Sequence, residues 1–265
     1  MKLNEFYALC DGLAPKALSD EYCAKYNAYD NSGILVDTGD EIKGVLFSLD
    51  LSFAAIEKAI NAGANLIVTH HPAIYGKIGD IRATDFAPLG KKLVECIRHG
   101  ISVIAMHLNL DCAIGGIDES LMQGVCANLV GANEKLMHPL SVGGYGRAYD
   151  IEKKNLLGLV EDLKKVFSTE RVLFYGDDRP ITRIASFCGS GADEGSVEFA
   201  VKNGAQAMIS SDFKHHVLGL ALEKGLAVIA LTHYASENYG FEKYYEKLRR
   251  QVDIPCVYHT DQELL

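Results

Sequence analysis

The sequence predicts an α/β protein made of two related α/β modules. Short apolar runs alternate with amphipathic stretches along most of the chain, which is the pattern of repeated βα units. Two motifs of the first half recur in the same order in the second half. With 265 residues, the chain is long enough for two domains of ordinary size.

The first module is predicted as strands and helices in alternation. GVLFSLD (44–50) is apolar and short enough for a strand. In the segment 52–63, Ser52 is a suitable N-cap, apolar residues follow with helical spacing, and Gly63 provides the C-terminal stop. The same reasoning predicts strands at 65–69 and 102–107 and helices at 88–100 and 119–132.

The second half repeats this pattern. AVKNGAQAMISSDFKHH aligns with AINAGANLIVTHH, and EKGLAVIALTHYASE aligns with RHGISVIAMHLNLD. One match between α/β segments could arise by chance, but two in the same order indicate copies of one βαβ-type module. The matched positions include Gly204 with Gly63, Met208 with Ile67, Gly225 with Gly100, and Val228 with Val103.

The glycine-rich stretch MHPLSVGGYGRAYDIEKKN (137–155) is the predicted crossing between the modules. We predict that residues 1–130 and 227–265 form the first module and residues 131–226 the second. In this division the tail returns to the first module, because Glu237 is expected to reach the candidate site residues of that module.

Composition and charge exclude several classes of protein. A net charge of −9 argues against general nucleic-acid binding and against binding to anionic membranes, both of which rely on basic surface. The seven cysteines are scattered and never spaced as CxxC, so neither a disulfide framework nor a thiolate zinc site is indicated. Glu5 and Asp11 interrupt the start where a signal peptide would be apolar. We therefore expect a cytoplasmic protein without membrane segments.

Candidate site residues gather at the predicted strand ends. Ligands of parallel α/β sheets lie beyond the carboxyl ends of strands, and four apolar runs here end in LIVTHHP, VIAMHLNLD, MISSDFKHH and VIALTHYASE. On a continuing strand His70 and His71 would point to opposite faces. With Pro72 ending the strand, they can diverge slightly and serve two neighbouring metal ions.

Two carboxylates and a third imidazole complete this set. His233 and Glu237 stand four residues apart and share one face if a helix begins there, and Asp111 follows His107 by the same interval. Such donors predict two divalent ions with open coordination positions, which suits hydrolysis by metal-activated water. Zinc, iron or manganese would fit these ligands. The predicted ligands are His70, His71, Asp111, His233 and Glu237.

The other histidines are interpreted more simply. His107 and His216 are left open as partners that orient ligands or as carriers of protons. The remaining candidates are expected to be surface residues or satisfied core residues: His99, His138 and His259. The glycine loop CGSGADEGS (188–196) precedes a helix, but Asp193 and Glu194 would repel phosphate, so it is interpreted as a structural turn.

Taken in order, the motifs resemble the NIF-three-like family, whose members are also called GTP cyclohydrolase I type 2 homologues. The resemblance covers nearly the whole chain and is carried by YDNSGILVD, GANLIVTHHPAIY, HLNLDCAIGGID, DDRPITRIASFCGSG, SSDFKHH and GLAVIALTHYASEN. It implies a dinuclear metal site in the cleft between two α/β modules, ring-shaped hexamers, and the same five ligands, with Glu237 bridging both ions. Two departures are GGID, where many members have GGVN, and Thr232, where glycine is usual.

The resemblance also implies an activity. The named reaction is opening of the purine imidazole ring of GTP by metal-activated water, with His107 or His216 moving protons. The substrate would be a small molecule, GTP or another phosphorylated compound. Two alternatives stay open: a non-catalytic metal-binding or regulatory adaptor protein, and a phosphoesterase acting on a non-nucleotide substrate.

Overall fold

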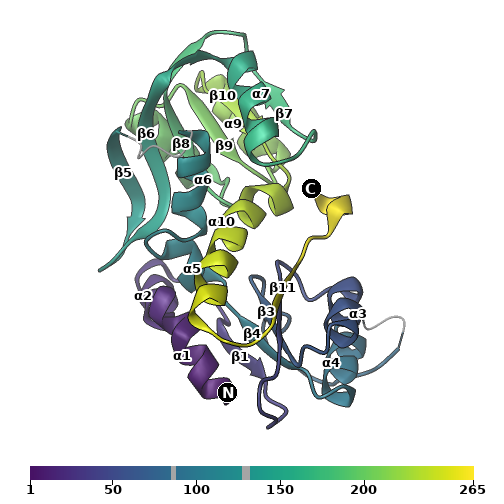
Figure 1. Ribbon diagram of the computed structural model, residues 1–265. Coiled ribbons are helices and arrows are strands. Elements are labelled where there is room, and N and C mark those ends of the chain that lie inside the picture. The colour runs from purple at the N-terminus through teal and green to yellow at the C-terminus, as the bar shows by residue number, and fades with distance from the viewer. Residues whose placement is uncertain (85–87, 127–131) are drawn as a thin grey trace. The chain divides into compact units, whose positions relative to one another are not determined.

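The computed structural model describes residues 1–84, 88–126 and 132–265. The described chain is mixed α/β with two sheets (Figure 1), as the sequence predicts. Its internal contacts divide it into two compact units. Unit 1 comprises Met1–Ala113 and Phe241–Asp261, and unit 2 comprises Ile114–Gly240 and Gln262–Leu265.

Unit 1 contains a five-stranded sheet in the order β1-β4-β3-β2-β11. Only the pairing of β1 with β4 is antiparallel. The strands are β1 (Gly33–Val36), β2 (Val45–Ser48), β3 (Leu66–Thr69), β4 (Ser102–Ala105) and β11 (Cys256–His259). The helices are α1 (Leu3–Leu13), α2 (Lys16–Tyr26), α3 (Phe53–Asn61), α4 (Pro88–Arg98) and the short α5 (Leu108–Cys112).

The central strands of unit 1 are buried on both faces. Every residue of β2, β3 and β4 is buried, which explains their continuous apolar sequences. Figure 1 shows α1 and α2 on one side of the sheet and α3 and α4 on the other. The predicted start of α3 is confirmed, because Ser52 Oγ accepts a hydrogen bond from Ala55 N at 3.0 Å.

Unit 2 contains a six-stranded sheet in the order β5-β6-β8-β9-β10-β7. Its strands are β5 (Ala132–Pro139), β6 (Gly144–Asn155), β7 (Leu173–Tyr175), β8 (Pro180–Ser186), β9 (Ala207–Ser210) and β10 (Ala227–Ala230). Its helices are α6 (Ile117–Val125), α7 (Leu156–Val166), α8 (Glu194–Lys202), α9 (His215–Glu223) and the first half of α10 (His233–Leu248). Two 3₁₀ turns follow, at Arg249–Gln251 and Gln262–Leu264.

The helix predicted at 119–132 is observed as α6, which ends at Val125. Part of that prediction, residues 127–131, lies outside the described residues. Ala132 already belongs to strand β5.

The predicted repeat is visible in the strand register. β3 and β4 are parallel neighbours that pair Ile67 with Val103, and β9 and β10 are parallel neighbours that pair Met208 with Val228. These four positions are the ones that the sequence alignment matched. The two βαβ segments therefore share register as well as sequence pattern.

The structure places the unit boundaries differently from the sequence-based division. Strand β10, which that division assigned to the first module, is hydrogen-bonded to β9 and β7 in the sheet of unit 2. Only Phe241–Asp261 of the tail belongs to unit 1, where β11 pairs with β2 in parallel. The repeat itself accounts for this, since β10 must lie beside β9 just as β4 lies beside β3.

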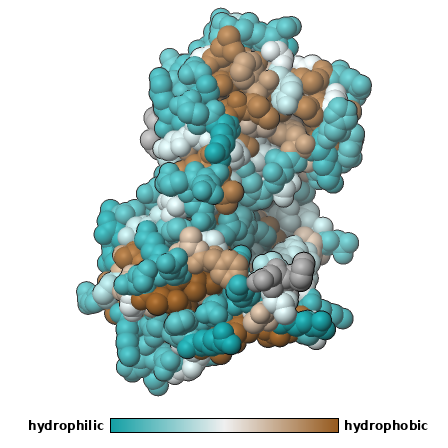
Figure 2. All heavy atoms as spheres, turned by 90° about the vertical axis from the view of Figure 1, so that its right-hand side faces the viewer, coloured by the Kyte–Doolittle hydropathy of each residue, from teal (hydrophilic) through white to brown (hydrophobic). Residues whose placement is uncertain are grey.

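Several large apolar side chains reach the surface of unit 1 on α3, on α4 and on the segment before α4. Figure 2 faces the side on which these helices lie, and it shows hydrophobic areas on a mostly hydrophilic surface. The exposed residues are Phe53, Ile60, Ile78, Ile81, Leu89 and Ile97. Within the described ranges, no helix combines the length and apolarity needed to cross a membrane.

Candidate metal centre

The end of β3 sets the positions of His70 and His71. The backbone N–H groups of both residues donate to the carbonyl of Leu49, at 3.1 and 3.0 Å, so the extended chain stops at Thr69. The two imidazoles therefore do not take the opposite directions of a continuing strand. Their ring centroids are 4.9 Å apart with the planes inclined at 49°. Both side chains belong to one local group.

The end of β4 brings two more candidates to this group. Helix α5 begins directly after His107, and Asp111 lies one turn into it, with its N–H donating to the His107 carbonyl at 2.9 Å. His70 Nε2 lies 3.4 Å from Asp111 Oδ1. The imidazoles of His70, His71 and His107 each offer a nitrogen within 4.8 Å of the other two. We call these three imidazoles and Asp111 the histidine group.

Each imidazole of the histidine group is anchored through Nδ1. Histidines that bind metals in proteins typically have such an acceptor behind the ring, which fixes the ring and its tautomer. The three acceptors are the Met106 carbonyl for His70 (2.8 Å), Asp50 Oδ1 for His71 (2.8 Å) and Asp30 Oδ1 for His107 (2.7 Å).

The anchoring of His70 determines where its hydrogen lies. A backbone carbonyl can only accept, so Nδ1 must be the donor to Met106. In the neutral ring Nε2 then carries a lone pair, and it lies 3.4 Å from a carboxylate oxygen of Asp111. Two lone pairs at this distance repel unless a cation, either a proton or a metal ion, interacts with both. The buried arrangement is therefore suited to a bound cation.

The other predicted pair lies at the start of α10 in unit 2. His233 and Glu237 are four residues apart on this helix, and His233 Nε2 lies 3.1 Å from Glu237 Oε2. His233 Nδ1 is hydrogen-bonded to Asp212, which follows β9. This fourth imidazole is anchored in the same way as the three of unit 1.

Gly189 is a residue of this region that the sequence analysis missed. It has φ of +55°, and its N–H donates to Ser236 Oγ at 3.1 Å. A Cβ atom at this position would lie 2.1 Å from Glu237 Oε1 and 3.3 Å from His233 Nε2. The turn after β8 can therefore approach the pair only because it carries glycine. The available signal was the glycine loop CGSGADEGS, which the sequence analysis interpreted only as a structural turn.

Burial and hydrogen bonds affect the Asp30 and His107 pair in opposite senses. Burial alone would raise the pKa of Asp30, but hydrogen bonds from His107, Ser19 and Ser32 bring it below its usual value. Burial would lower the pKa of His107, yet the hydrogen bond to Asp30 and the charges of Asp111 and Asp30 raise it above its usual value. Asp30 is therefore a firmly ionised anchor.

His216 occupies a different environment. It lies in the first turn of α9 with a side chain that is 62% exposed, and its Nε2 is 2.9 Å from Glu194 Oε1. The structure brings His107 into the histidine group but places His216 in a surface ion pair. The histidines interpreted as ordinary have local partners or partial burial: His99 lies 3.6 Å from Glu95, His259 lies 3.0 Å from Asp261, and His138 is half-buried with a pKa lowered by burial.

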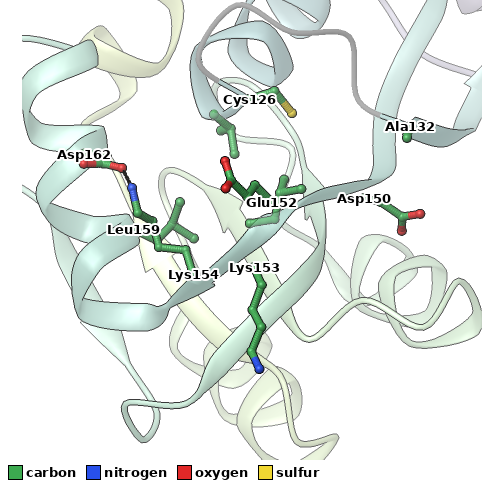
Figure 3. A pocket seen from close by; sticks show the side chains of 10 residues that line it. Cys126, Ala132, Asp150, Glu152, Lys153, Lys154, Leu159 and Asp162 are labelled. Carbon is green, nitrogen blue, oxygen red and sulfur yellow. Dashed lines mark hydrogen bonds and ion pairs between the residues drawn. The ribbon is translucent and has the colours of Figure 1, made fainter.

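Unit 2 also has a cavity of about 470 Å³ that none of the predicted site residues lines. Strand β6 shifts register against β8 between Asp150 and Lys154, and the side chains of this stretch surround the cavity with Cys126 (Figure 3). Lys154 is paired with Asp162 on α7. The described lining contains no histidine, so the cavity does not repeat the combination of imidazoles and a carboxylate found in the histidine group.

Comparison with known proteins gives consistent matches over the whole chain. A sequence model of the family described as Duf34/NIF3 (NGG1p interacting factor 3) matches residues 1–262. A Clostridium perfringens protein named GTP cyclohydrolase 1 type 2 homolog is 29% identical over 270 residues, which cover 99% of this chain and 97% of the relative. A Methanocaldococcus jannaschii protein of the same name is 29% identical over 262 residues, which cover 97% and 98% of the two chains.

Solved structures match the fold equally well. Reduced HcgD from Methanocaldococcus jannaschii superposes with a TM-score of 0.81 at 27% identity, covering 97% of both chains. A Bacillus cereus protein related to NIF3 gives a TM-score of 0.83 at 17% identity, covering 97% of this chain and 96% of that one. At 17% identity the second likeness concerns the fold alone. The family resemblance seen in the sequence motifs is confirmed.

Proposed function

The chain belongs to the Duf34/NIF3 (NGG1p interacting factor 3) family, and from this premise we propose that it is a metal-dependent hydrolase of a small phosphorylated molecule. Its proposed cofactors are two divalent ions of zinc, iron or manganese. GTP is the named substrate, because the curated relatives are called GTP cyclohydrolase 1 type 2 homologs. The proposed ligands are His70, His71, Asp111, His233 and Glu237.

The anchored imidazoles are the observation that carries this proposal. His70, His71 and His233 each direct Nδ1 to an oxygen acceptor, which orients the ring for binding through Nε2. Two of these Nε2 atoms face the carboxylates of Asp111 and Glu237. A mixed set of imidazole and carboxylate donors fits all three metals.

Divalent ions bound by such donors would lower the pKa of water and polarise an electrophile beside it. The chain's own residues would supply orientation and proton transfer. His107 is the better supported of the two predicted proton carriers, since its ring lies in the histidine group and is held by Asp30. The surface pairing of His216 with Glu194 gives it less support in this role.

The test is an assay of the metal-loaded, full-length protein with GTP. Loss of purine absorbance is expected from ring opening, and formate should follow when a second water molecule hydrolyses the resulting formamide. Both signals should disappear after chelation of the metal. A variant with His107→Gln should lose turnover while retaining its metal, because His107 is not among the proposed ligands. We also infer that the protein is cytoplasmic and forms a homohexamer, as the resemblance to the family implies. Sedimentation of the same preparation would measure the mass of the assembly.

A second candidate has a specific observation in its favour. The family description names an interacting factor, which favours a metal-binding or regulatory adaptor protein. Bound metal without turnover of GTP or of a panel of phosphoesters would contradict the hydrolase and support the adaptor. Turnover of a phosphoester without a purine ring would point instead to a phosphoesterase.

A further inference from the structure

Two tyrosines are unusual among those of this chain because their side chains are exposed. The chain has thirteen tyrosines, all within the described residues, and only Tyr29 and Tyr75 are exposed, by 53% and 61%. The other eleven are buried or half-buried. Exposing two neighbouring aromatic rings to water is unfavourable in free energy, and a ligand that covers them would remove part of this apolar surface from water.

These two tyrosines lie next to each other and next to the histidine group. The ring centroids of Tyr29 and Tyr75 are 5.3 Å apart with the planes at 89°, and Tyr75 meets His107 edge to face at 6.3 Å. His107 in turn lies 5.2 Å from His70. A continuous row of aromatic rings therefore runs within unit 1 from the exposed tyrosines to a fully buried imidazole.

Hydrogen bonds hold the two tyrosines in this arrangement. Tyr75 Oη donates to the Tyr29 carbonyl at 3.0 Å, and Asn31 Nδ2 donates to the Ile74 carbonyl at 2.7 Å. Asp30, between Tyr29 and Asn31 in the chain, is fixed by His107, Ser19 and Ser32. The two loops that carry the rings are thus fastened together, and a ligand would find the surface already ordered.

We propose that Tyr29 and Tyr75 form a stacking surface for the planar heteroaromatic ring of the molecule processed at the histidine group. The inference rests on the proposed function and assigns its substrate a flat ring of the nucleobase type. In an edge-to-face pair, one ring has both faces directed away from its partner, and a further ring can stack there. Nucleobases stack on aromatic side chains in this way whatever the base, because every base has a π-face.

The charges around these rings favour a neutral ring over a phosphate at this position. Asp30 anchors His107 and acts electrostatically on Tyr75, and a phosphate beside this carboxylate would be repelled. Burial, followed by the charge of Asp30, raises the pKa of Tyr75, so its hydroxyl stays neutral and offers no anion to the ring. The base would occupy the tyrosine side and any phosphate would lie elsewhere.

The test compares two ligands that differ only in the base. Isothermal titration calorimetry of the metal-loaded, full-length protein would use guanosine 5′-monophosphate and ribose 5-phosphate. Tyr75→Leu should weaken the binding of guanosine monophosphate about tenfold, because stacking on one aromatic ring contributes roughly this factor to the affinity. The binding of ribose phosphate should stay unchanged. Tyr75→Phe keeps the ring and loses only the hydrogen bond to the Tyr29 carbonyl, so its loss of affinity for guanosine monophosphate should be much smaller than that of Tyr75→Leu. Tyr29→Leu provides a second variant if Tyr75→Leu does not fold.

Tyr26→Leu is the matched control. Tyr26 is a half-buried tyrosine of the same unit, and its ring centroid lies 4.9 Å from that of Tyr22. Its replacement should change the affinity for neither ligand. Three outcomes would overturn the inference. They are an equal loss of affinity for both ligands, a loss of affinity in Tyr75→Phe as large as in Tyr75→Leu, and no binding of guanosine monophosphate by the unaltered protein. A smaller assembly mass for the Tyr75→Leu and Tyr29→Leu variants would also overturn it, by showing that the tyrosines cover a contact between copies of the chain.

The proposed function fails separately. Elemental analysis of the same samples reports metal, and a metal-free wild-type protein would contradict the hydrolase. Base-dependent binding by that metal-free protein would still support the stacking surface. Metal content that is equal in the wild type and in all tyrosine variants is expected, because no tyrosine is among the proposed ligands.

Discussion

At the scale of single residues, the hydrogen-bond acceptors behind the imidazoles are the main support for the proposed metal site. Four imidazoles use Nδ1 to bind an oxygen, and three of the acceptors are aspartates that come from other parts of the chain. These aspartates are Asp50, Asp30 and Asp212. An unanchored imidazole would rotate about its side-chain bonds and lose entropy on binding a metal. The anchored rings have lost that freedom during folding.

Gly189 gives a residue-scale prediction. Gly189→Ala should lower metal content, because the new Cβ would lie 2.1 Å from Glu237 Oε1 and must displace this carboxylate. Gly204→Ala is the matched control, since Gly204 also has a positive φ, +71°, but its Cβ would meet nothing within 4 Å. Both variants should lose about 1 kcal/mol of unfolding free energy from the left-handed backbone. Elemental analysis and chemical denaturation measure the two effects.

Equal metal content in Gly189→Ala and Gly204→Ala would show that the contact with Glu237 does not position a ligand. A loss of metal in both would indicate a general effect of backbone strain.

At the scale of elements, the strand ends of the two units use equivalent positions for different purposes. His70 and His71 follow β3, and Ser211 and Asp212 follow β9 at the matching positions. In unit 2 these positions hold groups that support the His233 and Glu237 region: Asp212 anchors His233, and Ser211 Oγ donates to the Gly189 carbonyl. A single βαβ plan thus supplies candidate ligands in one unit and supporting groups in the other.

The helix starts give an element-scale prediction. Ser52 caps α3 and Asp193 caps α8 at matching positions, where Asp193 Oδ1 accepts from Ser196 N at 2.7 Å. Asp193→Ala and Ser52→Ala should each lower the unfolding free energy by about 1 kcal/mol, because one N–H of the first turn loses its acceptor. Urea denaturation followed by circular dichroism measures this. Asp193→Asn keeps an acceptor and should remain near wild type.

A loss in Asp193→Asn as large as in Asp193→Ala would contradict capping as the cause. It would instead indicate that the negative charge of Asp193 at the helix start provides the stabilisation.

At the scale of the whole molecule, the proposed donors are distributed over both units. His70, His71 and Asp111 belong to unit 1, whereas His233 and Glu237 belong to unit 2. The same distribution means that losing donors from either unit should affect metal binding. The fold of each unit should survive, because these side chains follow strands or begin helices and lie outside the apolar clusters around Met208 in unit 2 and Ile67 in unit 1.

Metal stoichiometry tests this distribution. His70→Ala combined with Glu237→Ala should abolish the second ion, and His71→Ala or His233→Ala alone should each lower metal content. His99→Ala is the control, because His99 is an exposed partner of Glu95 and not a proposed ligand. Circular dichroism should show a retained fold in every variant. Unchanged metal content in the double variant would contradict the ligand assignment.

The local features of this protein were predictable because they depend on short stretches of chain. Hydrophobic periodicity located most central strands and helices, and Ser52 marked the start of α3. The internal alignment even gave the shared register of β3 with β4 and of β9 with β10, since the paired strands of each copy are separated by one helix. The strand ends also indicated His70, His71 and Asp111 as neighbours, because parallel strands end at one edge of a sheet.

Contacts between distant segments could not be predicted in this way. Sequence periodicity does not reveal which sheet a strand joins, so only the structure showed that β10 pairs with β9 and β7. It also decided that Gly189 approaches Glu237, and that Asp30 and Asp50 anchor His107 and His71. The sequence by itself indicated the candidate donor residues and the repeated βαβ plan, through local propensity and spacing. Tertiary structure alone decided how these donors are oriented, because their acceptors come from parts of the chain with no fixed spacing to them.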